Sequence, residues 1–142
     1  MKDAFREYIL DLGLGGPALE RCSRVLAFYD GVGLNAEDIF ISEYREANNN
    51  RVYESMLVFT KSHIAEAHQF LTSDIYDMTA IGKMFYWKVS RSDYEGRAAG
   101  EAARLSVTVQ FENNLSCNMK ASGHNCDFLR DIFNKYFASK VQ

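Results

Sequence analysis

The chain has 142 residues, of which 47% are hydrophobic and 25% are charged, as in an ordinary soluble globular protein. A chain of this length can bury a sizeable core, so we expect residues 1–142 to form a single domain. The net charge of −3 and the isoelectric point near 5.6 remove the electrostatic reason to expect nucleic acid or an anionic membrane as the main partner.

Neither a membrane-spanning segment nor a secretory leader is expected. No window approaches the roughly 18–20 apolar residues that a membrane span requires. The first seven residues, MKDAFRE, are too charged for a signal peptide. Cys22, Cys117 and Cys126 are an odd number of cysteines that lie far apart or on different predicted elements, which favours a reduced protein in the cytoplasm.

The chain begins with two predicted helices. Four apolar residues recur at helical spacing in residues 2–12, namely Phe5, Tyr8, Ile9 and Leu12. Pro17 suits the first turn of a second helix, which Gly31 and Gly33 terminate. Between the helices, the segment GLGG has the glycines of a phosphate-binding loop. It follows a helix and lacks the Gly-Lys-Ser/Thr ending, so a helix–helix connection is favoured.

The middle of the chain has the alternation and composition of β-strands. Strands are predicted at residues 38–46, 52–61 and 83–92, with a polar turn at residues 48–50. Residues 74–80 are expected to form a short strand or a bridging segment. The segment MLVF, at residues 56–59, is apolar on both faces, which is typical of a central, covered strand. Residues 63–71 alternate as a strand does but are also rich in helix formers. Both readings stay open there, and the hairpin context favours a strand.

A loop at residues 93–103 leads to a predicted hairpin. Apolar Val107, Val109 and Phe111 alternate with polar residues, and residues 115–122 repeat this pattern. The intervening pair Asn113-Asn114 suits a two-residue turn, because asparagine tolerates positive φ. Each strand therefore offers one apolar and one polar face, as in a sheet that is covered on one side.

An amphipathic helix is predicted to follow Gly123, with Asn125 as its N-cap. Six large side chains form its apolar stripe: Phe128, Leu129, Ile132, Phe133, Tyr136 and Phe137. Each contributes about 1.5–3 kcal/mol when it is buried. This helix is therefore expected to cover the sheet and to be a major stabiliser.

Together the predicted elements give an α+β fold. Two N-terminal helices precede a strongly bent antiparallel sheet or barrel of about six or seven strands, and the C-terminal amphipathic helix caps it. Strands that follow one another with short links favour a meander, bent until it closes or nearly closes.

The order of elements resembles a bacterial pleckstrin-homology-like (PH-like) domain over residues 37–139. The resemblance rests on SMLVFTK at residues 55–61, on the aromatic strand that ends with WKVSR at residues 87–91, and on the last hairpin with its helix. It implies a helix-capped barrel with residues 1–33 as a helical extension. It also implies a non-catalytic module for protein interaction or scaffolding.

The resemblance carries over no phosphoinositide site. Near the first predicted hairpin, basic and acidic residues are interspersed: Glu43, Arg45, Glu46, Arg51, Glu54 and Lys61. Such mixing makes a poor phosphate cradle. We therefore expect a protein partner, without nucleic acid and without insertion into a membrane.

The candidate partner surface comprises Trp87, Arg91, Arg97 and Arg104. Trp87 ends the run FYW, and consecutive residues of a strand point to opposite faces, so at least one ring leaves the core. That ring either packs under the N-terminal helices or belongs to an exposed patch. The three arginines lie in or beside the predicted loop, which is the second candidate contact surface.

No catalytic residue, metal or cofactor is expected. Cys117, His124 and Cys126 lie within ten residues, but a closed zinc site needs a fourth ligand, and buried structural thiols are favoured. His63 and His68 would face opposite sides of a strand, and an acid–base role for His68 would require a partner such as Glu66 on its own face. Serine hydrolase, Walker and Rossmann signatures are absent from the sequence.

Two other functions remain as alternatives. The first is a small cone of the nuclear-transport-factor-like kind that binds a small ligand or performs simple acid–base chemistry; the N-terminal helices suit it, but the helical C-terminus does not. The second is an immunity or anti-defence protein that blocks the surface of a partner.

Overall fold

The computed structural model describes residues 1–81, 84–91, 103–112 and 116–138, with the backbone alone for Phe85 and Arg91. The chain divides into two compact units. The first comprises Met1–Ile41 and Glu54–Ala80, and the second comprises Ser42–Tyr53 and Ile81–Gln142. The polypeptide therefore passes between the units three times, at residues 41–42, 53–54 and 80–81.

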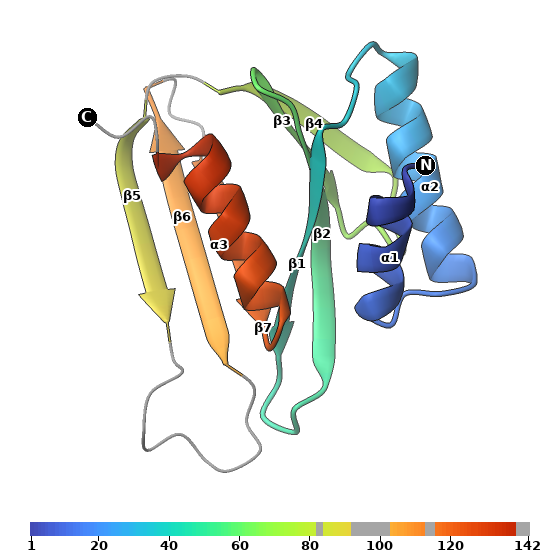
Figure 1. Cartoon of the computed structure of the whole chain (residues 1–142), viewed down its shortest axis with the longest axis horizontal. Coiled ribbons are helices and arrows are strands. Elements are labelled where there is room, and N and C mark those ends of the chain that lie inside the picture. The colour runs from blue at the N-terminus through green and yellow to red at the C-terminus, as the bar shows by residue number, and fades with distance from the viewer. Residues whose placement is uncertain (82–83, 92–102, 113–115, 139–142) are drawn as a thin grey trace. The chain divides into compact units, whose positions relative to one another are not determined.

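The fold is α+β, with two N-terminal helices, antiparallel strands and a C-terminal helix, as predicted (Figure 1). The predicted bounds agree with the observed ones to within a few residues. The elements are α1 (Asp3–Asp11), α2 (Pro17–Gly31), β1 (Asp38–Arg45), β2 (Arg51–Phe59), β3 (His63–His68), β4 (Ile75–Ala80), β5 (Met84–Arg91), β6 (Arg104–Phe111), β7 (Ser116–Ser122) and α3 (Asn125–Tyr136).

The strands form two sheets, one with the order β1-β2-β3-β4 and one with the order β5-β6-β7. The prediction of one continuous meander was wrong, because β4 and β5 belong to different sheets, and no closed barrel is found among the described residues. Alternation of apolar and polar residues fixes the face on which a side chain lies. It does not fix the neighbour with which an edge strand pairs.

In the first unit, the glycine-rich segment connects α1 to α2, as predicted. Gly13 and Gly16 have φ values of +84° and +58°, which favour glycine. Gly16 is the N-cap of α2 and Pro17 occupies its first turn. Leu14 lies between these glycines and is buried, so this connection is anchored in the core.

Helix α2 packs against β3 and β4 through aromatic and polar contacts. The hydroxyl of Tyr29 lies 2.8 Å from the carbonyl oxygen of Asp77 and 3.1 Å from that of Glu66. The rings of Phe28 and Tyr76 lie 4.5 Å apart, centroid to centroid. Arg21 donates hydrogen bonds to two backbone carbonyls between β3 and β4, those of Phe70 and Ser73. These contacts fix the helix over the edge of the four-stranded sheet.

The ambiguous segment at residues 63–71 is a strand over His63–His68, as the hairpin context favoured. Each of its residues pairs with β4, and its last five pair with β2. The strand ends where Gln69 adopts a positive φ of 47°. Pairing on both sides has overridden the helix propensity of Ala65, Glu66 and Ala67, because β3 is a central strand.

In the second unit, α3 packs on β6 and β7 (Figure 1). Leu129, Ile132, Tyr136 and Phe137 are buried, as predicted. The prediction was wrong for Phe128, whose side chain is 44% exposed. Phe128 stands at the border of the apolar stripe, and the sheet covers the centre of that stripe.

The predicted N-cap of α3 was also wrong. Asn125 is the first helical residue, and His124 occupies the cap position without a side-chain hydrogen bond to the helix. The Asn125 side chain is buried instead, and its Nδ2 donates a hydrogen bond to Glu43 over 3.3 Å. A tertiary partner has therefore replaced the local capping interaction.

Glu43 is the centre of a buried polar cluster in this unit. Its carboxylate accepts hydrogen bonds from the backbone N–H of Ser122, over 2.6 Å, and from the Ser122 hydroxyl. Its Oε1 lies 3.1 Å from Nε of Arg51. Because Glu43 is fully buried, these partners and Asn125 replace the hydrogen bonds that water would make to its carboxyl group. The cluster joins the β1–β2 hairpin to β7 and the start of α3.

Candidate functional site

The apolar face of the three-stranded sheet is only partly covered by α3. Paired registers place Trp87 opposite Val109 and Val89 opposite Val107, all four on one face. Val107 and Val109 are buried, whereas Trp87 and Val89 on β5 are 45% and 38% exposed. The helix therefore covers β6 and β7 and leaves the same row of β5 open.

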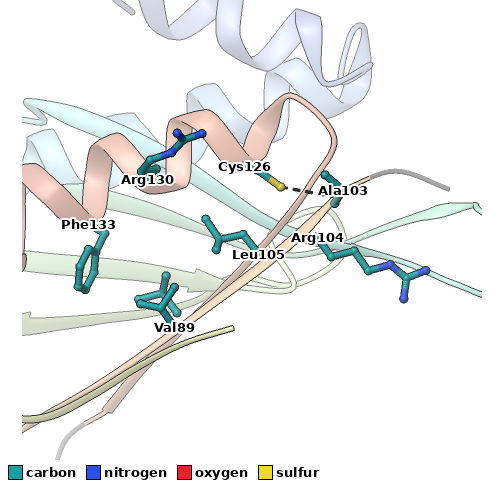
Figure 2. Close-up of a pocket in the computed structure, with 8 residues that line it drawn as sticks. Val89, Ala103, Arg104, Leu105, Cys126, Arg130 and Phe133 are labelled. Carbon is teal, nitrogen blue, oxygen red and sulfur yellow. Dashed lines mark hydrogen bonds between the residues drawn. The ribbon is translucent and has the colours of Figure 1, made fainter. Parts of the chain in front are cut away.

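This uncovered strip borders a pocket of about 170 Å³ between the strands and α3. Figure 2 shows Val89, Leu105 and Phe133 around the apolar interior. Arg104 extends away from it along the rim, and Arg130 lies on α3 above it. The rings of Trp87 and Phe133 are 5.6 Å apart, so a helix–strand contact continues the apolar surface beyond the pocket. We call the pocket together with exposed Trp87 and Val89 the β5 groove.

The backbone of β5 is an open sheet edge, because no strand pairs with its outer side in the part of the chain that the structure describes. The other edge of this sheet, β7, is occupied. The backbone N–H of Lys120 donates to the Ser42 hydroxyl over 2.9 Å, and that of Ser122 donates to Glu43. Side chains of β1 thus accept hydrogen bonds from the outward-facing backbone N–H groups of β7. The edge at which a further strand can pair is therefore that of β5.

Two of the four residues of the predicted partner surface lie at this groove. Trp87 is exposed beside it, and Arg104 lines it. Arg91 is the last residue of β5, and its side chain is not described. Arg97, like most of the predicted loop at residues 93–103, lies outside the described residues. Phe133 and Leu105 also line the groove but were not predicted as part of the partner surface, because as apolar residues of the helix and the hairpin they were expected to be buried in the core.

Three titratable side chains meet in the first unit. His68 Nε2 lies 2.6 Å from Asp77 Oδ2, and His68 Nδ1 lies 3.4 Å from Glu66 Oε2. Burial raises the pKa of the Glu66 carboxyl, while His68 and the Ser55 hydroxyl oppose this effect. Glu66 does lie on the face of His68, as an acid–base role would require. Both ring nitrogens of His68 face carboxylates, however, so the arrangement directs neither at a substrate.

The cysteines show no zinc-site geometry. Cys117 is buried and Cys126 is half-buried, with Cys126 Sγ 3.6 Å from the carbonyl oxygen of Ala103. Among the described residues, no three His, Cys, Asp or Glu side chains are grouped so that they could hold a metal ion. In the same set of residues, no helix has the length and apolar character needed to cross a membrane.

Cys22 is expected to be inert toward thiol reagents in the folded protein. It is fully buried in α2, and this burial raises the pKa of its thiol to about 12, so the reactive thiolate is scarce at mildly alkaline pH. Cys126 should therefore be alkylated first, and Cys22 only after denaturation. Peptide mass mapping after brief alkylation checks this order. Equal labelling of both cysteines in the native protein would contradict it.

Comparisons with known proteins name no family for this chain. No family model matches the chain, and no curated protein matches its sequence. Among solved structures, the chain is similar to the crystal structure of the C-terminal domain of an unknown protein from Leishmania infantum. The sequence identity is 12%, the TM-score is 0.49, and the match covers 82% of this chain and 96% of that one. At this TM-score the likeness carries no argument about function.

Proposed function

We propose that the protein is a non-catalytic, PH-like interaction module that binds an extended segment of a partner protein along β5. The observation that carries the proposal is the open edge of β5 beside an apolar groove, with Trp87 and Val89 exposed in a row whose other members are buried. The described residues form seven strands, in sheets of four and three, followed by a C-terminal helix, and this order of elements supports the PH-like assignment.

An extended segment suits both parts of the groove. Its backbone would pair with the outward-facing N–H and C=O groups of β5, with which no strand among the described residues pairs. Every second side chain would point toward α3. Those side chains would meet Val89, Leu105 and Phe133, which are apolar. The bound segment is therefore expected to carry apolar residues at alternate positions.

The charges at the groove favour an acidic residue in the bound segment, next to its apolar residues. Arg104 and Arg130 line the groove, and none of its described lining residues is acidic. Arg130 pairs with Asp127 at the surface of α3, where an ion pair contributes little and exchanges readily. A carboxylate beside the apolar positions of the partner would approach both arginines.

A peptide library displayed on phage tests this function. Selection against the purified protein is expected to enrich peptides with alternating apolar residues and an acidic residue. Val89→Glu should weaken their binding by about tenfold or more, because it places a charge in the desolvated part of the interface. Fluorescence anisotropy with a selected peptide measures the affinity.

The matched control is Tyr86→Glu, since Tyr86 is similarly exposed on β5 and lies on the opposite face of the sheet. This variant should bind the peptide as the wild type does. Selection that yields no consensus, or peptides whose affinity is equal for the wild type and Val89→Glu, would refute the proposal. An immunity or anti-defence protein would use the same groove, and the identity of its partner would distinguish that role.

A further inference from the structure

The outer edge of β4 is a feature of the first unit that the proposed peptide binding does not use. β4 is the last strand in the order β1-β2-β3-β4, and no strand among the described residues pairs with its outer side. Its six residues pair with β3 without a register shift, so the edge has no bulge. Asp77 is its one charged residue, and the strand contains neither lysine nor proline. Natural sheet edges are usually protected by such features, so this edge is suited to pairing with a further strand.

An apolar row on one face of the sheet continues to this edge. Ala65 of β3 pairs with Met78, and Ala67 pairs with Tyr76, so all four side chains lie on one face. Both alanines are fully buried, whereas Met78 is 49% exposed. The ring of Tyr76 lies 4.5 Å from that of Phe28 on α2, which is itself 44% exposed. Apolar side chains therefore lie beside the open backbone of β4, and pairing with a further strand would cover them.

We propose that the protein forms a homodimer in which the β4 strands of two copies pair antiparallel about a two-fold axis. Directly opposite residues of such a pair lie on the same face of the sheet. Two registers then pair five residues of each strand, one centred on Asp77 and one centred on Met78. The first places two Asp77 carboxylates opposite each other, which is destabilising. The second places Asp77 opposite Thr79 of the second copy, so charge selects the register centred on Met78.

This register matches the chemistry of β4 on both faces of the sheet. On the face toward α2, the two Met78 side chains meet at the axis, and Tyr76 lies opposite the small side chain of Ala80. Methionine packs favourably against methionine and against aromatic rings. On the other face, the Thr79 hydroxyl can donate to the Asp77 carboxylate of the second copy. The strand is therefore complementary to a second copy of itself.

The size of this contact predicts a weak dimer. A pair of six-residue edge strands is smaller than the interface of a typical stable complex, which buries roughly 1,200–2,000 Å². We therefore expect a dissociation constant in the micromolar range or above. Sedimentation velocity of the full chain, from micromolar to near-millimolar concentration, is the measurement. The sedimentation coefficient should rise with concentration toward that of a dimer.

Met78→Lys and Met78→Glu are the test variants, because each places two like charges opposite each other at the axis. Each should raise the dissociation constant of the dimer by at least about tenfold. An equimolar mixture of the two variants should restore the dimer, since opposite charges then pair across the axis. Restoration also shows that both variants are folded, so loss of the dimer in each alone is not a folding defect.

Thr79→Lys is the matched control. It adds the same charge to the same edge, but opposite Asp77 of the second copy, so this variant should dimerise at least as well as the wild type. Equal weakening by Thr79→Lys and Met78→Lys, or a mixture of the Met78 variants that stays monomeric, would overturn the proposal. A wild type that stays monomeric at near-millimolar concentration would also overturn it and would leave the edge open to another protein.

The dimer can be tested separately from peptide binding. β4 belongs to the first unit, whereas the residues that line the β5 groove belong to the second. The Met78 variants should therefore bind the selected peptides as the wild type does. Failure of the dimer leaves the proposed peptide binding standing, and failure of peptide selection leaves the dimer standing.

Discussion

Replacing Glu43 with alanine is expected to lower the free energy of unfolding by about 3–5 kcal/mol, the usual cost of removing one partner from a buried ion pair. The substitution leaves the Arg51 guanidinium, whose side chain is only 19% exposed, beside a cavity. It also removes the acceptor for the backbone N–H and hydroxyl of Ser122 and for the Asn125 amide. Unsatisfied buried donors add to the cost.

Urea denaturation followed by circular dichroism measures this effect. Glu46→Ala is the control, because Glu46 is an exposed glutamate on the same hairpin, and its loss should change the stability by no more than about 0.5 kcal/mol. Glu43→Gln keeps the shape and loses the charge, so it should lie between the two. Similar midpoints for Glu43→Ala and Glu46→Ala would show that the cluster contributes nothing to stability.

Truncation of Leu129 on α3 is the second substitution with a large expected effect. Leu129 is fully buried against the sheet, so Leu129→Ala should destabilise the protein by about 2–5 kcal/mol through lost apolar burial and the cavity that remains. Phe128→Ala, one residue earlier, should cost much less, because that ring is 44% exposed. Thermal unfolding of both variants tests the contrast. A larger loss for Phe128→Ala would contradict the burial of Leu129 and the exposure of Phe128.

The helices and strands could be predicted because their signals are local. The alternation of apolar and polar residues shows which side chains of a strand face the core, as at residues 104–112. The spacing of apolar residues does the same for a helix, as at residues 128–137. The structure confirms most of the faces predicted in this way. The pairing of β4 was not predictable in this way. Its residues are mostly exposed, so no hydrophobic row specifies a neighbour beyond β3.

The buried cluster and the β5 groove depend on contacts between distant residues. Glu43 and Ser122 are 79 positions apart, and glutamate is rarely fully buried, so a surface position was the reasonable expectation. One local signal did exist. Ile39, Phe40 and Ile41 are apolar on both faces of β1, which is typical of a strand that is covered on both sides. A strand of this kind continues into Ser42 and Glu43.

The position of the hairpin that carries Glu43 determines where the protein can be cut into fragments. Residues 42–53 belong to the second compact unit, although the segments on either side of them belong to the first. A truncated product that ended at Ala80 would retain Glu43 and Arg51 but would lack Ser122 and Asn125. It would thus expose the Glu43 carboxylate, which the intact protein buries completely. Neither unit is a contiguous piece, so cutting at residue 80 separates neither of them cleanly.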